Sequence, residues 1–336
     1  MIIKETVDYS NFKSYFILRG NNEHLARGEL RALLEIYDPK ALIICYTMIC
    51  LATTTPDKLH KVIRRAGYVK EAGSLLSVYS AYSIDHAKNA SSLLRDKSVH
   101  VSIMKSTIRE DTVKQFLNIA GLKPSYRGIG EQRLIFTDGV AILGRKIEVN
   151  DFAKQAGDSK AKPFNRSIAL KPDISRVLVN LTRAREGSII IDPFAGTGSV
   201  LIEAWRMGIL AVGVDVDWNL TKGMEYNLEY FKIPSIVILS DSRYLSFREV
   251  DHVATDLPYG RGASTHGVEL RELYKDFMEK LSDYLSKSGY ACFMTPLWLE
   301  EYVDELISAY GFKLTERYYD YAHGSLTRTI NVVRKW

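Results

Sequence analysis

The chain has 336 residues, of which 46% are hydrophobic and 25% are charged. This composition excludes a collagen-like, low-complexity or disordered chain and provides enough apolar material for the cores of two or three domains. The formal net charge is +5, but residues 1–165 carry 25 Lys and Arg against 17 Asp and Glu, whereas residues 166–336 carry 20 against 23. The basic first part favours contact with a polyanion such as nucleic acid, although an uneven solvated surface would give the same pattern.

Neither secretion nor a membrane span is expected. The N-terminal segment MIIKETVDYS has no apolar signal core, so we expect a cytoplasmic protein. The longest apolar run, residues 41–52, is too short to cross a bilayer. Cys45, Cys50 and Cys292 lie in no CxxC motif and no Cys/His cluster. We therefore expect three buried thiols, with neither a disulfide nor a zinc site.

Residues 1–72 alternate strand and helix in the order strand, helix, strand, strand, helix, strand, which is typical of a ferredoxin-like domain. The apolar run after the first helix is either one long strand or a hairpin. Residues 73–150 form a second α/β unit that ends in two strands. The pair Asp138-Gly139 joins these strands and is a strong hairpin signal. The polar stretch 151–165, with Gly157 and Pro163, is expected to be a linker.

From residue 166 to the end, continuous apolar strands alternate with amphipathic helices. This pattern predicts a Rossmann-like α/β domain, in which helices cover both faces of a parallel sheet. The last 26 residues are rich in strand signals, and we expect two final antiparallel strands at the edge of the sheet.

The motif DPFAGTG, residues 192–198, directly follows an apolar strand and opens a helix. Gly196 and Gly198 would let a ligand approach the backbone closely at the start of the helix. The motif is not the GxGxxG dinucleotide fingerprint, which disfavours a nicotinamide or flavin enzyme. Taken alone it would also fit a tight strand-to-helix turn.

Acidic residues follow the next two strands. Asp215 stands where an acidic side chain accepts hydrogen bonds from ribose hydroxyls in nucleoside-binding sheets. Asp217 could instead cap the following helix. Asp241, followed by Ser242, could accept a hydrogen bond from an adenine amino group, or face water in a loop.

The motif DLPYG, residues 256–260, ends the fourth strand. It places a carboxylate, a proline-fixed turn and an aromatic ring at the carboxyl edge of the sheet, where ligands bind in open α/β folds. An exocyclic amine is a poor nucleophile because its lone pair is delocalised into the ring. If Asp256 and the Leu257 carbonyl accept its hydrogens, the lone pair becomes available, while Tyr259 offers a face for an extruded base.

DPFAGTG followed by a [DN]-P-P-Y motif resembles amino-methyltransferases that act on nucleic-acid bases. The two small α/β units ahead of it resemble the THUMP-containing branch, and the whole chain is similar to tRNA guanosine-10 2-amino-methyltransferases of the compact archaeal form. The resemblance is specific over residues 163–262 and loose over residues 1–150. The segment 163–172, PFNRSIALKP, resembles one that lines the methyl-donor pocket in that family. DLPYGR departs from the family's DPPYGR at Leu257, but both forms keep the carbonyl before Pro258, so we expect activity.

The resemblance implies a class I methyltransferase domain at residues 166–336, behind a ferredoxin-like domain at 1–72, a THUMP domain at 73–150 and the linker. It implies S-adenosylmethionine as the cofactor and tRNA as the partner. We expect no metal, because the sulfonium already contains a good leaving group, and no covalent enzyme intermediate, because no cysteine lies in any of the motifs. A monomer is expected, and the sequence does not reveal an accessory subunit. The residues expected to bind the cofactor are Asp192, Phe194, Gly196, Thr197, Gly198, Asp215, Val216, Asp241 and Ser242. The residues expected to act in catalysis are Asp256, Leu257, Pro258 and Tyr259.

The expected reaction is methylation of the 2-amino group of a guanosine in tRNA, at position 10. Other candidates are a THUMP methyltransferase acting on another tRNA position or on rRNA, and a non-catalytic RNA-binding protein. A DNA amino-methyltransferase is disfavoured, because no insert resembles a target-recognition domain. Basic residues near predicted helix ends and loops in the first part are the expected RNA contacts, namely Arg64, Arg65, Lys123, Arg127, Arg133 and Arg145.

Overall fold

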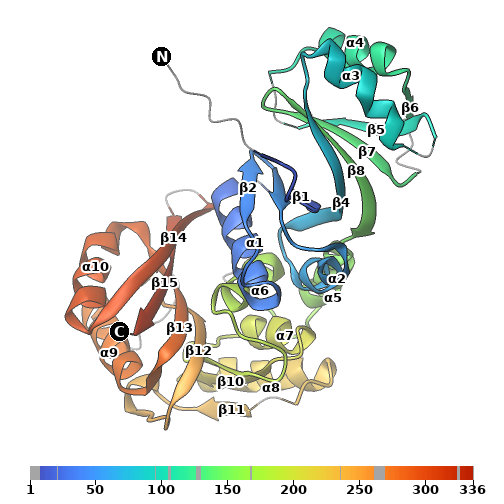
Figure 1. Cartoon of the computed structure of the whole chain (residues 1–336). Coiled ribbons are helices and arrows are strands. Elements are labelled where there is room, and N and C mark those ends of the chain that lie inside the picture. The colour runs from blue at the N-terminus through green and yellow to red at the C-terminus, as the bar shows by residue number, and fades with distance from the viewer. Residues whose placement is uncertain are drawn as a thin grey trace. The chain divides into compact units, whose positions relative to one another are not determined.

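The structure is a computed structural model of the whole chain. It describes residues 8–20, 22–94, 96–104, 107–125, 130–166, 169–234, 236–260, 269–323 and 326–335. The chain forms two compact units, residues 1–151 and 152–336 (Figure 1). Among the described residues, no helix is both long and apolar enough to cross a membrane.

The first unit begins with four antiparallel strands in the order β2-β3-β1-β4. This order and the chain sequence β-α-β-β-α-β are those of a ferredoxin-like fold, as expected. The elements are β1 (Ser14–Leu18), α1 (Glu23–Tyr37), β2 (Ile43–Tyr46), β3 (Ile49–Ala52), α2 (Pro56–Arg65) and β4 (Val69–Ser80).

Strand β4 is twelve residues long and continues into the second half of this unit, where it pairs with β8. The eight strands therefore form one sheet in the order β2-β3-β1-β4-β8-β7-β5-β6, and the expected boundary between residues 72 and 73 falls inside β4. Asp138 and Gly139 both have positive φ and join β7 to β8, which confirms the expected hairpin. The remaining elements are α3 (Ile84–Ala90), η1 (Ser91–Leu93), β5 (Ser98–Ile103), α4 (Glu110–Ala120), β6 (Lys123–Ser125), β7 (Gln132–Thr137) and β8 (Val140–Val149).

Tyr15 holds the centre of this sheet together. Its ring lies against Gly73 of β4 and Gly144 of β8, and its hydroxyl donates a 2.9 Å hydrogen bond to the buried Glu71. A methyl group on Gly144 would lie 2.6 Å from the Tyr15 ring and 2.9 Å from the Ser74 carbonyl oxygen. Both glycines are therefore needed to make room for the aromatic ring.

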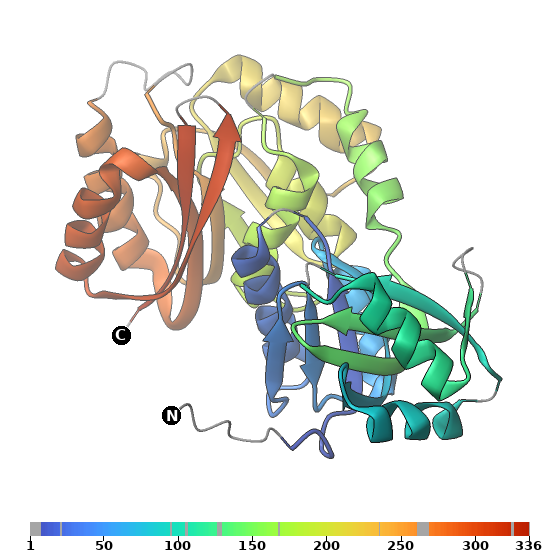
Figure 2. The ribbon, with the colours of Figure 1, turned by 90° about the horizontal axis from the view of Figure 1, so that it is seen from above.

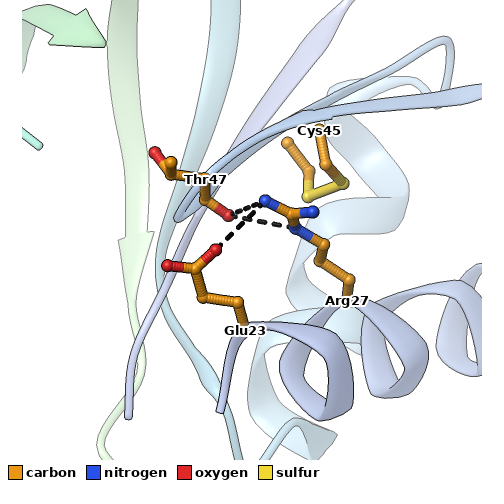
Figure 3. The surroundings of a disulfide bond; sticks show 5 residues. Glu23, Arg27, Cys45 and Thr47 are labelled. Carbon is orange, nitrogen blue, oxygen red and sulfur yellow. Dashed lines mark hydrogen bonds and ion pairs between the residues drawn. A yellow bond between two sulfur atoms is a disulfide. The ribbon is translucent and has the colours of Figure 1, made fainter. Parts of the chain in front are cut away.

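The expectation of three free thiols is wrong for two of the cysteines. The apolar run 41–52 forms the hairpin β2–β3, in which Cys45 and Cys50 lie directly opposite each other and form a disulfide (Figure 3). Only the register of the hairpin brings them together, and the sequence left open whether a hairpin forms at all. Arg27 of α1 donates hydrogen bonds of 3.0 and 2.6 Å to the Thr47 carbonyl at the hairpin turn. Cys292 is free and buried.

The second unit contains a seven-stranded sheet in the order β11-β10-β9-β12-β13-β15-β14. The first five strands are parallel, and β15 runs antiparallel to both β13 and β14. The last two strands lie side by side at one edge of this sheet, as expected (Figure 2, red). The strands are β9 (Ile189–Asp192), β10 (Leu210–Asp215), β11 (Ile236–Leu239), β12 (Val250–Asp256), β13 (Leu285–Pro296), β14 (Phe312–His323) and β15 (Leu326–Lys335).

Helices cover this sheet because its strands are apolar on both faces. On one face, α9 and α10 pack against β12, β13 and β15 in a core that includes Phe277, Phe293 and Val333. Helix α6 contacts β12 and β13, and it packs against α7. The stretch expected to be a linker contains the helix α5. The helices are α5 (Phe152–Lys160), α6 (Pro172–Leu181), α7 (Ser199–Arg206), α8 (Trp218–Tyr230), η2 (Ser242–Tyr244), α9 (Leu270–Tyr284), η3 (Leu297–Leu299) and α10 (Glu300–Ala309).

The substitution Gly144→Ala should lower the free energy of unfolding of the first unit by about 1–3 kcal/mol, because the added methyl group overpacks the Tyr15 site. Urea unfolding of the full chain measures this loss. Gly157→Ala is the control, since a Cβ at this helical position meets no atom within 4 Å and should be neutral or stabilising. Equal stability of the Gly144→Ala variant and the wild type would contradict the packing role of this glycine.

Candidate active site

The two sequence motifs meet where the strand order of the second sheet reverses. Strand β9, which precedes DPFAGTG, lies between β10 and β12, and DLPYG follows β12. Ligands bind beyond the carboxyl ends of parallel strands at such a switch point. The Thr255 hydroxyl at the end of β12 donates a 2.6 Å hydrogen bond to Oδ1 of Asp192 at the end of β9. This bond connects the two motifs, which are about sixty residues apart in the chain.

The turn after β9 has the conformation that its glycines were expected to provide. Gly196 and Gly198 have φ values of 53° and 82°, which other residues rarely adopt. A Cβ on Gly196 would meet open space, so the backbone is accessible there, whereas Gly198 packs against Met224. Asp192 is buried, and burial raises the pKa of its carboxyl to about 7. Since Asp192 Oδ1 also accepts the Phe194 amide hydrogen at 3.2 Å, this side chain braces the turn from within.

Asp215 organises the same turn from the end of β10. Its Oδ2 accepts the Gly196 amide hydrogen at 2.8 Å, and its Oδ1 accepts the Asp217 amide hydrogen at 2.9 Å. Asp215 therefore has structural partners at this turn, and its contact with ribose hydroxyls stays a prediction. Val216 beside it is 44% exposed. Asp217 caps α8 by accepting the Asn219 and Leu220 amide hydrogens, as the helix-cap alternative required.

Two expected cofactor residues have structural partners of their own. The Phe194 ring packs edge-on against Phe277 of α9, with ring centres 5.9 Å apart, and joins the core. Asp241 caps η2 and forms an ion pair with Arg243 at 2.7 Å. The cap and the ion pair give Asp241 a structural role. Contacts of Asp241 and Ser242 with an adenine ring stay predictions.

The DLPYG motif is held by hydrogen bonds and by the core. The Tyr259 hydroxyl donates to Oδ1 of Asp256, and the Tyr274 hydroxyl of α9 donates to the Pro258 carbonyl at 2.9 Å. The Leu257 side chain is buried in the core beneath α9, and its amide hydrogen bonds to the Met294 carbonyl at 3.3 Å. A proline at position 257 could not make this bond, so the departure from the family motif adds an anchor.

Asp256 also lies in the electrostatic field of an ion pair. Asp256 is aligned with Met294 of β13, and Pro296, two residues further along β13, is aligned with Arg328 of β15. Arg328 is 9% exposed and pairs with Asp320 of β14 at the same edge of the sheet. Burial raises the pKa of the Asp256 carboxyl to about 6, the positive charge of Arg328 opposes this rise, and Asp320 adds to it.

The structure adds residues that the sequence analysis did not single out. The buried Asn227 of α8 bonds to both the amide and the carbonyl of Phe164 at 2.8 Å, and its side-chain amide also donates to the Thr197 carbonyl at 3.0 Å. The Phe164 ring lies so close to Gly223 that a Cβ there would approach it to 2.0 Å. This clamp attaches the segment before α6 to the glycine turn. The sequence signal for this clamp was the pair Gly223 and Asn227, which are four residues apart and therefore lie on the same face of a helix.

Five of the six expected RNA contacts have described side chains, and these differ in exposure. Arg65 and Arg133 are buried, and Arg133 pairs with Glu71 at 2.9 Å, so the expectation that they contact RNA is wrong. Arg64 is exposed beside Glu148, and Lys123 is exposed. Arg145 is half-buried, and Arg127 lies outside the described residues.

The substitution Asp215→Ala should weaken binding of S-adenosylmethionine by about 2–3 kcal/mol, because the expected hydrogen bonds to ribose and the brace on Gly196 would be lost together. Calorimetric titration measures the dissociation constant. Asp217→Ala is the matched control, since it removes only the cap of α8 and should leave the affinity close to that of the wild type. An unchanged dissociation constant for Asp215→Ala would remove this residue from the site.

Comparison with known proteins places the chain among methyltransferases. Residues 160–300 match the family model described as "UPF0020: RMKL-like, methyltransferase domain". A curated "tRNA (guanine(10)-N2)-dimethyltransferase" from Methanothermobacter thermautotrophicus is 38% identical over 60% of this chain, and the match spans 58% of that relative's length. The protein of the same name from Methanocaldococcus jannaschii is 25% identical over 95% of this chain and 99% of its own.

A "Probable tRNA (guanine(10)-N2)-dimethyltransferase" from Methanothermococcus thermolithotrophicus is 32% identical over 48% of this chain, and 98% of its own length is covered. The crystal structure of TrmN from Thermus thermophilus superposes with a TM-score of 0.56 at 17% identity, covering 96% of this chain and all of that one. This match shows a shared Rossmann-like methyltransferase fold. The sequence relatives show that the chain belongs to the tRNA guanine N2-methyltransferase family.

Proposed function

We propose that the chain methylates the exocyclic 2-amino group of guanosine 10 in tRNA, with S-adenosylmethionine as the methyl donor. The observation that carries this proposal is the placement of the Asp256 carboxylate next to the glycine turn at the switch point of the sheet. The names of the three relatives described above support the choice of guanosine 10 and of its 2-amino nitrogen.

The residues around the glycine turn fit the methyl donor. The open space over Gly196, the Asp215 carboxylate beside it and the exposed Val216 together form a surface for a nucleoside. S-adenosylmethionine, when bound, supplies an electrophilic methyl group on a sulfonium sulfur, and its transfer to the amine releases one proton.

Asp256 orients the amine and receives that proton. Its carboxylate must be ionised to accept hydrogen bonds from the amine, which makes the nitrogen lone pair available for attack. Tyr259 already donates to Oδ1, so the amine either uses the second oxygen or displaces the hydroxyl. Burial and the nearby carboxylate raise the pKa of Tyr259 well above its ordinary value, so its hydroxyl stays protonated and remains a donor. The ring is the proposed stacking surface for the extruded base.

The first unit is the proposed tRNA-binding part, with its residues 73–150 as a THUMP domain. Its charge supports this role, although Arg64 and Lys123 are better placed than the buried arginines to contact phosphates. Since tRNA is the proposed substrate, we propose a cytoplasmic location. The Cys45–Cys50 disulfide does not support this location.

The function is tested by incubating the purified chain with unmodified tRNA and a methyl donor that carries an isotopic label. Mass spectrometry of the nucleosides should show labelled 2-methyl- or 2,2-dimethylguanosine, and mapping should place the label at position 10. A label at another tRNA position, or in rRNA only, would correct the substrate. Binding of the methyl donor without any transfer to RNA would contradict the proposed activity.

Asp256→Ala should lower turnover by at least about a hundredfold, because a positioned acid-base group is lost, while binding of the methyl donor changes little. Asp256→Asn distinguishes two roles, since its amide oxygen accepts a hydrogen bond but does not take a proton. Activity well above that of Asp256→Ala favours orientation of the amine, and an equal loss favours proton acceptance. Tyr259→Phe should keep most activity if the ring stacks on the base, whereas Tyr259→Ala should not. Near-wild-type turnover of Asp256→Ala would overturn this mechanism.

The rate should rise with pH as Asp256 ionises, with an apparent pKa of about 6 in kcat/KM. Arg328→Gln removes a nearby positive charge and should move this rise to higher pH. Asp320→Asn removes a negative charge and should move it to lower pH. Full pH profiles of the two variants give shifts of opposite sign if the effect is electrostatic. A loss of rate at every pH without any shift would show that the pair only supports the structure.

A further inference from the structure

Tyr274 of α9 is a buried tyrosine whose hydroxyl is directed at the DLPYG motif. Its side chain is 1% exposed and lies in the hydrophobic core that also contains Leu257 and Phe277. The hydroxyl donates a 2.9 Å hydrogen bond to the Pro258 carbonyl. Burial raises the pKa of Tyr274 well above its ordinary value, so the hydroxyl stays protonated and remains a donor. A phenylalanine would fill the same space in this core, so what the tyrosine adds is the bond to Pro258.

This hydrogen bond holds the peptide group that precedes Tyr259. The Pro258 carbonyl belongs to that planar group, so its orientation determines the direction in which the Tyr259 side chain leaves the backbone. On the other side of Pro258, the Leu257 amide hydrogen bonds to the Met294 carbonyl at 3.3 Å. The Tyr259 hydroxyl donates back to Oδ1 of Asp256. The turn that follows Asp256 is thus held at three consecutive residues, and α9 holds the middle one.

The same face of α9 also reaches the glycine turn. Phe277 lies three residues after Tyr274, on the same side of the helix. Its ring packs edge-on against Phe194 of the DPFAGTG motif, with ring centres 5.9 Å apart. Between them in the sequence, Asp276 pairs with Arg243 of η2 at 3.5 Å. Helix α9 therefore contacts the cofactor motif and the DLPYG motif together, and Tyr274 connects it to the second of these.

We propose that Tyr274 is a positioning residue for methyl transfer, which acts through Tyr259. Its hydroxyl fixes the Pro258–Tyr259 peptide group, and this keeps the Tyr259 ring at the base and the Tyr259 hydroxyl at Asp256. The inference rests on the proposed function, because the ring and the carboxylate have these roles only in that reaction. Without the Tyr274 hydroxyl the Pro258 carbonyl loses its donor, and a small misplacement of the groups around a reacting centre slows the reaction strongly.

This role predicts a change in the pH dependence as well as in the rate. Burial raises the pKa of the Asp256 carboxyl to about 6, and the hydrogen bond from Tyr259 opposes this rise. If the Tyr259 hydroxyl moves away from Asp256, the carboxyl ionises only at higher pH. The rise of kcat/KM with pH then moves in the same direction. A loss of support for the fold alone would not produce such a shift.

The test compares Tyr274→Phe with the wild type, using the full chain, tRNA and S-adenosylmethionine. The substitution removes one hydroxyl and should lower kcat by about tenfold, which corresponds to the loss of one hydrogen bond. The rise of kcat/KM should move to higher pH. Calorimetric titration with S-adenosylhomocysteine should give a dissociation constant close to that of the wild type, which also shows that the variant is folded. Tyr284→Phe is the control and should keep the rate and the pH profile, because the ring of this buried tyrosine packs against Phe247 at the C-terminal end of α9.

A double variant shows whether Tyr274 acts through Tyr259. In a chain that carries Tyr259→Ala, the ring and the hydroxyl that Tyr274 positions are absent. Adding Tyr274→Phe should therefore slow methyl transfer no further in single-turnover measurements.

Three results would overturn the proposal. An equal fold loss in both backgrounds would show that Tyr274 acts independently of Tyr259, and a loss of rate without a pH shift would show that it only supports the fold. An unchanged kcat of Tyr274→Phe would show that the bond to Pro258 is not needed for the reaction. If the wild type itself transfers no methyl group to tRNA, the proposed function fails as well, and this result differs from a failure confined to the variants.

Discussion

The hydrogen bond between Thr255 and Asp192 joins the two halves of the candidate site, and the other features of the site depend on it. It lies where β9 and β12 run side by side, at the point where the order of the strands reverses. On one side Asp192 and Asp215 brace the glycine turn, and on the other Asp256 follows Thr255 directly. The sheet and this bond therefore hold the proposed cofactor surface beside the proposed acceptor for the amine.

The methyltransferase unit also contains buried ionisable side chains. Two charges of opposite sign act on the buried Asp256. Arg328 lowers the pKa of its carboxyl, and Asp320 raises it. Lys162 is buried without a described counter-ion, and Glu203 nearby is compensated by arginines. Burying an ionisable group carries an energetic penalty, and such groups cluster where chemistry or binding needs them. The carboxylate that we propose for the amine, Asp256, is one of these buried groups.

In the basic first unit, the number of positively charged residues does not indicate which of them lie on a binding surface. Arg133 contributes to the net charge, yet it is buried in a network with Glu71 and Tyr15 that supports the centre of the sheet. A guanidinium group is indistinguishable in sequence whether it faces RNA or a buried carboxylate. Exposure separates the two roles, and it leaves Arg64 and Lys123 as the better candidates for phosphate contacts.

Local chemistry determined much of this protein from the sequence alone. The Asp138-Gly139 hairpin, the glycine turn after β9 and the cap at Asp217 depend on residues that are neighbours in the chain, and the alternation of apolar strands and helices predicts the parallel sheet. Only the tertiary structure decided which distant residues meet. The Cys45–Cys50 disulfide depends on a hairpin register, the clamp of Asn227 on Phe164 spans 63 residues, and the effect of Arg328 on Asp256 crosses three adjacent strands. Such contacts are set by register, burial and packing, which emerge only when the whole unit has folded, and they leave no periodic signal in the sequence.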